Sequence, residues 1–121
     1  LFTASSVPAR LQHLEPALPP RAVLMVYQTL VSGYLQAEER AAYEHGLREL
    51  LHKTAPGPVL WLELEIGDET QPVEPAILRA TVNAGGSVRT LELARTSYHP
   101  ATLAVRHDSA RELSAVYEHE R

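Results

Sequence analysis

The chain of 121 residues contains no cysteine. This absence excludes disulfide bonds, thiolate nucleophiles and zinc sites built on cysteine. It also fits a reducing compartment, so we expect the protein to be cytoplasmic. No apolar run approaches the ~20 residues that a membrane span needs, and we therefore expect no membrane partner.

Positive charge is scarce as well. Lysine and arginine total 11 against 15 aspartate and glutamate residues, which leaves a formal net charge of −4. The basic residues form no cluster or stripe along the sequence. Nucleic-acid binding depends on neutralising phosphates, so we expect no nucleic-acid partner.

An initiating methionine is missing from the first position. The chain opens at Leu1, and its only methionine is Met25. A length of 121 residues suffices for one domain with a core, but not for two. We therefore expect residues 1–121 to form a single α/β domain that is the C-terminal portion of a larger chain.

The most informative stretch that is present is Ala22–Gln28, an almost unbroken apolar run that ends in a polar pair. An uninterrupted apolar strand is typical of a central strand in a parallel sheet, buried on both faces. A helix is expected over 37–53 and a second strand over Val59–Ile66. Strand, helix and strand in this order predict one βαβ crossover.

The rest of the chain predicts shorter elements around this unit. Asn83–Gly86 has the glycine pair typical of a hairpin turn, and Ser109-x-x-Glu112 is a capping-box pattern that indicates a helix start. The expected elements are a helix over 5–15, a loop or short helical turn over 29–35, strands over 77–82 and 88–94, a short strand over 102–106, and a helix from 108.

Ligands of open α/β sheets bind beyond the carboxyl ends of the strands. Tyr27 and Gln28 end the first strand, and Tyr34 follows in the next turn. An amide can hydrogen-bond a ligand, and tyrosine offers a ring and a hydroxyl. These three residues are our candidate cofactor-binding residues. In the alternative interpretation Gln28 caps the turn and both tyrosines pack.

Two further clusters carry suitable chemistry but have common structural explanations. His45, Glu49 and His52 share a helical face and contain zinc-ligand types, although such a face is more often solvated. We expect no metal site. Glu63 and Glu65 share a strand face and suit acid–base work if burial separates their pKa values. More often, such a pair marks a strand end that faces solvent.

One histidine lies in an expected loop, within Tyr98-His99-Pro100. Histidine titrates near neutral pH and can act as a general base. A lone loop histidine is more often simply exposed. The residues therefore assign no catalytic group.

Several segments resemble the C-terminal part of a bacterial family of unknown function. They are the stretch Val23–Leu35, the acidic helix start Glu38-Glu39-Arg40 and the Trp-containing strand Leu60–Glu65. The resemblance implies a partial Rossmann-like, methyltransferase-like sheet, with an antiparallel hairpin and a C-terminal helix after the strand–helix–strand unit. It also implies that the complete protein binds a nucleotide-type cofactor such as S-adenosylmethionine, with a glycine-rich loop before Leu1.

Three hypotheses for function remain open on the sequence. The first is the C-terminal half of a methyltransferase-like domain that binds a small molecule when complete. The second is a small α/β binding module that forms a homodimer and completes its sheet through the partner, without catalysis. The third is a relative that keeps the fold and has lost the chemistry.

Overall fold

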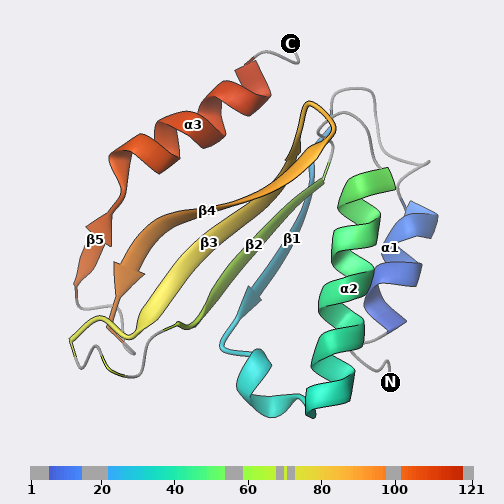
Figure 1. Ribbon diagram of the computed structural model, residues 1–121, viewed down its shortest axis with the longest axis horizontal. Coiled ribbons are helices and arrows are strands. Elements are labelled where there is room, and N and C mark those ends of the chain that lie inside the picture. The colour runs from blue at the N-terminus through green and yellow to red at the C-terminus, as the bar shows by residue number, and fades with distance from the viewer. Residues whose placement is uncertain are drawn as a thin grey trace.

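The computed structural model in Figure 1 describes residues 6–14, 22–53, 59–67, 70, 73–97 and 102–118. These residues form a five-stranded sheet with helices on both of its faces. The described elements, in chain order, are α1 (Val7–Leu14), β1 (Leu24–Thr29), the 3₁₀ helix η3 (Ser32–Tyr34), α2 (Ala37–Lys53), β2 (Val59–Ile66), β3 (Ala76–Ala84), β4 (Ser87–Thr96), β5 (Leu103–Val105) and α3 (His107–Glu118).

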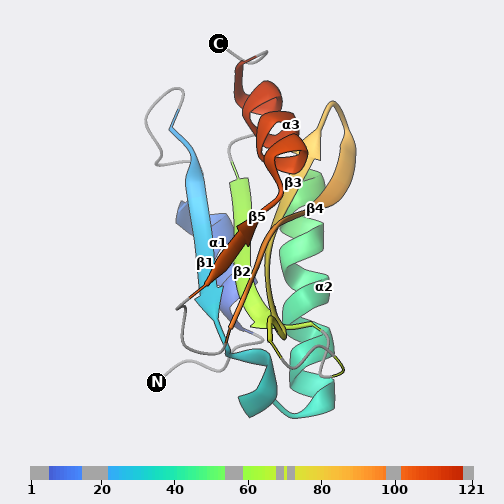
Figure 2. The same cartoon turned by 90° about the vertical axis from the view of Figure 1, so that its left-hand side faces the viewer.

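The strands follow one another across the sheet in the order in which they occur along the chain. β1 and β2 are parallel, and each later neighbour is antiparallel to the strand before it. Figure 2 shows β1 at one edge of the sheet. The predicted strand–helix–strand unit followed by a hairpin and a C-terminal helix is therefore confirmed as a mixed α/β architecture.

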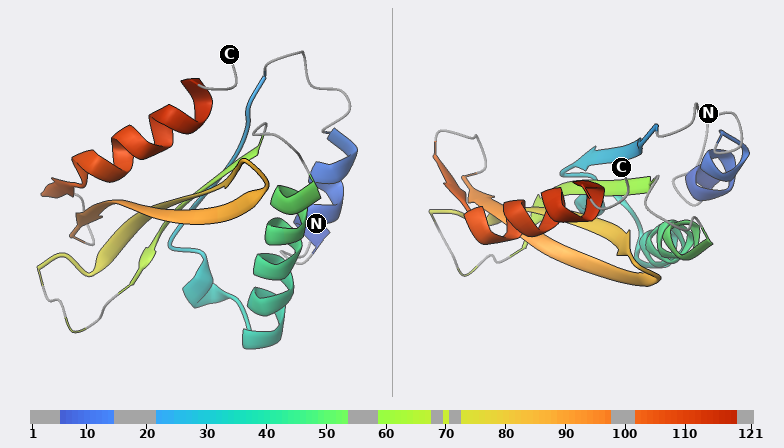
Figure 3. Two further views of the ribbon diagram at one scale, coloured as in Figure 1. Left: turned by 45° about the horizontal axis from the view of Figure 1, so that its top comes forward. Right: turned by 90° about the horizontal axis from the view of Figure 1, so that it is seen from above.

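Two apolar clusters lie on opposite faces of the sheet. α1 and α2 lie side by side on one face, and α3 lies on the other (Figures 1 and 3). Val59 and Trp61 of β2 point toward α2, whereas Leu60 points toward α3. Successive strand side chains alternate between faces, so β2 supplies core to both sides.

Helix α2 has the predicted bounds. Tyr43, Leu47, Leu50 and Leu51 recur at helical spacing and are buried against the sheet. Acidic residues lie in the first turn and basic residues in the last, as the helix dipole favours. This seam holds the crossover between β1 and β2.

The β3–β4 hairpin is longer than predicted, and its turn has the expected chemistry. Gly85 and Gly86 have φ values of 63° and 90°, which a two-residue type I′ turn requires. Asn83 Oδ1 accepts a hydrogen bond from the Gly86 amide (2.9 Å), and its Nδ2 donates to the carbonyl of Leu51 (2.9 Å). One side chain therefore closes the turn and ties it to the end of α2.

Helix α3 begins earlier than the sequence pattern indicated. It starts at His107, so Ser109 lies inside the helix and does not cap it. Leu113, Val116 and Tyr117 share the predicted face and pack against the sheet. No helix in the described part of the chain is long and apolar enough to cross a membrane.

Strand β1 differs most from its prediction. Val23, Met25 and Tyr27 are 46%, 55% and 56% exposed, whereas Val26 and Gln28 are buried. β2 is the neighbour of β1 among the described strands, and α3 packs over β2, β3 and β4 but not over β1 in the described cluster. The prediction of a central strand that is buried on both faces is therefore wrong for this structure, because one face of β1 is uncovered.

Candidate functional site

A buried polar network joins β1, β2 and α2. Gln28 Oε1 accepts hydrogen bonds from the Tyr43 hydroxyl (2.6 Å) and from Trp61 Nε1 (3.1 Å). Gln28 Nε2 donates to Glu65 Oε1 (2.8 Å). All four residues are buried. Because Gln28 holds an acceptor bond to one side and a donor bond to the other, its amide has a single orientation that satisfies its neighbours.

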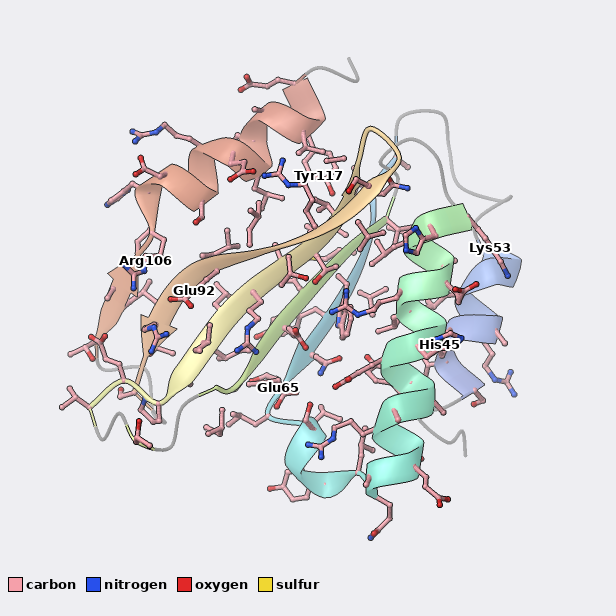
Figure 4. All side chains as sticks on the ribbon, in the orientation of Figure 1. His45, Lys53, Glu65, Glu92, Arg106 and Tyr117 are labelled. Carbon is pink, nitrogen blue, oxygen red and sulfur yellow. The ribbon has the colours of Figure 1, made fainter. Side chains whose placement is uncertain are left out.

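The Glu65 carboxylate also holds the chain that leaves β1. Its Oε1 accepts hydrogen bonds from the amides of Val31 (3.0 Å) and Ser32 (3.1 Å), and the Ser32 amide lies 3.3 Å from Oε2. Glu65 is 6% exposed, and Figure 4 shows it beside the loop between β1 and α2. Burial of a charge is costly unless donors replace water, and Gln28 and these amides supply them.

The loop adopts an uncommon backbone conformation to reach this carboxylate. Leu30 has a φ of 52°, in the left-handed region, and Val31 is right-handed at φ −85°, ψ −36°. Left- and right-handed residues in succession aim consecutive amides at one point and form a nest for an anion. The Leu30 amide itself donates to the Leu64 carbonyl (2.8 Å), and the next amide, that of Val31, donates to Glu65. Hydrogen bonds therefore fix the backbone before and after Leu30.

A polar row crosses the sheet next to this network. Gln28 of β1 pairs with Glu63 of β2, Glu63 with Arg79 of β3, and Arg79 with Glu92 of β4. Two residues nearer the amino end of β2, the next row on the same face starts with the buried residues Val26 and Trp61. The face that α2 covers therefore changes from apolar to charged toward the carboxyl ends of β1 and β2.

Glu92 at the far end of this row is already neutralised. Its Oε1 accepts from Arg95 Nε (2.9 Å) and Arg106 Nε (3.4 Å). The hydrogen bond from Arg95 and the two positive charges lower the pKa of Glu92. Figure 4 shows Glu92 and Arg106 on the side of the molecule away from α2. We therefore interpret this group as a tie between β4 and the segment after β5.

The carboxyl group of Glu63 differs from those of Glu65 and Glu92 in its hydrogen bonding. No hydrogen bond or ion pair joins its half-buried carboxyl to another residue of the described chain. Burial raises the pKa of Glu63, Glu65 and Glu44 add to the rise, and Arg79 and Arg48 oppose it. A half-buried acid with a raised pKa and unused acceptors suits a ligand contact or a proton transfer.

Tyr43 remains a hydrogen-bond donor across the physiological pH range. Burial, followed by the nearby charges of Glu63, Glu65 and Glu44, raises the pKa of Tyr43 to about 12. Its ring meets Trp61 edge to face, with centroids 6.2 Å apart. The ring contact and the hydrogen bond to Gln28 together fix α2 over the sheet.

The structure does not bring the three candidate cofactor-binding residues together. Gln28 points into the network, whereas Tyr27 points to the opposite face of β1 because neighbouring strand residues alternate. Tyr34 is 89% exposed in η3. Neither tyrosine packs as the alternative interpretation expected, and Gln28 bonds to side chains of β2 and α2. Cofactor binding by these residues stays a prediction.

The other candidate groups have mixed outcomes. Glu65 is buried, so its interpretation as half of a solvent-facing pair is wrong. His45, labelled in Figure 4, and His52 are exposed on α2. The described residues contain no group of three acidic or histidine side chains that could hold a metal. His99 and its neighbours Tyr98 and Pro100 lie outside the described residues.

Sequence reasoning missed Tyr43, Trp61 and the amides of Val31 and Ser32 as parts of the site. Tyr43 looks like an ordinary member of the apolar stripe of α2. Trp61 shares its strand face with Glu63 and Glu65, and this mixture of one indole with two acids was the available signal. Backbone amides leave no trace in side-chain composition.

Comparison with known proteins identifies a family. No curated protein and no solved structure matches the chain. The family described as "Uncharacterized protein conserved in bacteria (DUF2332)" matches residues 3–104, which include β1 to β4 and the whole Gln28–Glu65 network. The chain therefore belongs to this uncharacterised bacterial family.

Proposed function

We propose that this chain forms one half of a small-molecule site in a larger, methyltransferase-like α/β domain. The site lies at the carboxyl ends of β1 and β2, and it takes a nucleoside-type cofactor such as S-adenosylmethionine. The observation that carries the proposal is the buried network of Gln28, Tyr43, Trp61 and Glu65 at the point where parallel strands of α/β proteins bind ligands.

The network provides rigidity. Each of its hydrogen bonds fixes a side chain or the loop after β1, so the polar edge is held in one geometry before a ligand arrives. Such preorganisation lowers the entropy that binding must offset. A buried glutamate with three donors is more elaborate than a simple strand-to-helix connection requires, which favours a role in recognition.

Glu63 provides the contact. Its carboxyl group points to the same face as Glu65, is half-buried and accepts no hydrogen bond from the part of the chain that the structure describes. A carboxylate accepts hydrogen bonds from ribose hydroxyls and attracts ammonium or sulfonium groups. These are the groups that S-adenosylmethionine presents, so Glu63 is the residue that we expect to touch it.

Calorimetric titration of the complete gene product with S-adenosylmethionine tests this proposal. We expect binding by the wild type and at least about tenfold weaker binding by Glu63→Gln, because one charged contact is removed. Glu118→Gln, at an exposed position of α3, is the matched control and should bind S-adenosylmethionine as the wild type does. Absence of binding by the wild type, or equal binding by Glu63→Gln, would contradict the proposal and favour a fold that has lost its chemistry.

A second candidate function is self-association through β1. Val23, Met25 and Tyr27 form an exposed apolar stripe, and β1 contains none of the charges, prolines or bulges that protect edge strands. We expect concentration-dependent dimers in analytical ultracentrifugation that Met25→Lys abolishes. Val73→Lys, at a similarly exposed apolar position, is the control. A monomer at every concentration would exclude this candidate.

A further inference from the structure

We propose that Glu65 is a built-in anion that excludes phosphate from the candidate site. This inference rests on the proposed function, and it narrows the ligand class. The end of the ligand that faces the β1–α2 loop is neutral or cationic, as in a nucleoside or S-adenosylmethionine, and is not a phosphate.

The backbone amides of the loop after β1 are already occupied by a carboxylate. Backbone amides after a parallel strand are the usual phosphate donors of α/β proteins, and a nest of such amides binds anions. In this loop the Val31 and Ser32 amides lie 3.0 Å and 3.1 Å from Glu65 Oε1. The position that a phosphate oxygen would take is therefore filled by the protein's own carboxylate.

The Glu65 carboxylate is also fixed in position by a hydrogen bond to a buried side chain. Gln28 Nε2 donates to the same Oε1 at 2.8 Å, and Tyr43 and Trp61 fix Gln28 in turn. Glu65 is 6% exposed and cannot turn out to solvent without breaking this network. A phosphate would have to displace a buried, hydrogen-bonded charge.

Glu63 adds a second carboxyl group beside the amide nest. Glu63 lies two residues away on the same face, and burial raises its pKa although the charges of Arg79 and Arg48 oppose the rise. A phosphate at the loop would meet two carboxyl groups, whereas an ammonium or hydroxyl group would be stabilised by them. The charges and the occupied amides thus point to the same ligand class.

Titration of the full chain with inorganic phosphate, followed by ¹⁵N–¹H NMR, tests the inference. In the wild type we expect the Val31 and Ser32 amide resonances to stay unchanged. Glu65→Ala opens the nest. In this variant the same resonances should shift as phosphate is added, and the apparent affinity for phosphate should be at least about tenfold higher than that of the wild type. Glu118→Ala removes the same charge from an exposed position of α3 without freeing an amide, and it should behave like the wild type.

Two outcomes would overturn the inference. One is a phosphate-dependent shift of the Val31 and Ser32 amides in the wild type, and this test needs no variant. The other is a folded Glu65→Ala protein whose amides respond no more strongly than those of the wild type. If Glu65→Ala does not fold, Glu65→Ser, which retains a small polar group, takes its place under the same criteria.

These measurements use no cofactor, so they fail separately from the proposed function. A protein that binds S-adenosylmethionine and also binds phosphate at this loop would keep the function and lose the inference. A protein that excludes phosphate until Glu65 is removed, but binds no nucleoside cofactor, would keep the inference about the nest and lose the function.

Discussion

The two faces of the sheet are held by different kinds of contact. On the α2 face, buried residues from β1, β2 and α2 form one cluster, and a hydrogen-bond network continues it toward the carboxyl ends of the strands. On the α3 face, a smaller cluster is covered by a helix with no buried residue in the described chain. The ion pair between Arg89 and Glu112 adds a partly exposed tie between β4 and α3.

The contacts on the α2 face therefore define one arrangement of side chains, whereas α3 mainly covers apolar surface on the other face. Apolar contacts tolerate many arrangements of similar volume, whereas a buried polar network has one satisfied geometry. The α2 face therefore both stabilises the fold and orients the polar edge. We expect α3 to contribute area with little specificity, and the following predictions test this contrast.

The largest effect should come from Trp61. It is 2% exposed, packs against Tyr43 and donates to Gln28. Trp61→Ala should lower the free energy of unfolding by about 3–5 kcal/mol, measured by urea denaturation. Val116→Ala on α3 should cost about 1 kcal/mol because Val116 is only partly buried. Equal losses would show that the two faces are not different in kind.

Gln28→Leu should be the next largest. Leucine has a similar volume but no polar atoms, so the Tyr43 hydroxyl and the Trp61 N–H lose their acceptor and Glu65 loses a donor. We expect a loss of about 2–3 kcal/mol. Thr29→Leu, at an exposed neighbouring position on β1, is the control and should change stability little. A near-neutral Gln28→Leu would mean that the network contributes shape alone.

Tyr43→Phe should have a smaller effect, because the ring and its packing remain. Loss of the hydroxyl bond to Gln28 should cost about 1 kcal/mol. In the wild type, ultraviolet titration should show a tyrosine that ionises near pH 12, and this component should vanish in Tyr43→Phe. Because its folded pKa is raised from 10.0, the stability from Tyr43 should fall as pH rises through the window from 10.0 to about 12. Tyr34→Phe is the exposed control, and loss of the high-pH component in that variant would contradict the assignment.

Glu63→Gln should produce the smallest and most diagnostic change, a gain in melting temperature. Burial raises the pKa of Glu63 above its usual 4.5, so the folded state binds its proton more tightly than the unfolded state. Stability from this group is therefore highest below pH 4.5 and falls as pH rises through the raised value. Glutamine avoids that loss.

The comparison is the melting temperature of both proteins at pH 4 and at pH 7. We expect the gain of Glu63→Gln at pH 7 to shrink at pH 4, where both side chains are neutral. A residue whose removal stabilises the fold but weakens ligand binding is typical of a functional site. A gain of equal size at both values of pH would exclude titration of Glu63 as its cause.

Helix α2 and the hairpin could be predicted because their signals are local. The apolar spacing from Tyr43 to Leu51 and the glycine pair after Asn83 act within a few residues of chain. The start of α3 was misjudged for the same reason, because Ser109 has the right local pattern but the helix already begins at His107. When two local patterns indicate different starts for a helix, only the packing of that helix against the sheet decides between them.

Three residues of the candidate network were singled out in the sequence, and a role for them in binding stays a prediction. Gln28 was chosen by its position at a strand end and the pair Glu63 and Glu65 by their shared strand face, and the structure places all three on the face that α2 covers. Tyr27 was grouped with Gln28 because they are adjacent in sequence, although adjacent strand residues face opposite ways. The partners of Gln28 lie 15, 33 and 37 positions away along the chain, beyond the reach of any short motif.

By itself, the sequence determined the element types, the βαβ order and the location of the polar residues at the ends of two strands, because hydrophobic periodicity and turn chemistry are local properties. Tertiary structure alone decided which of those residues are buried, that Glu65 fills the amide nest after β1, and that the Glu63 carboxyl has no hydrogen-bond partner among the described residues. These features depend on which side chains and amides meet across the sheet, and only the folded chain brings those groups within hydrogen-bond distance.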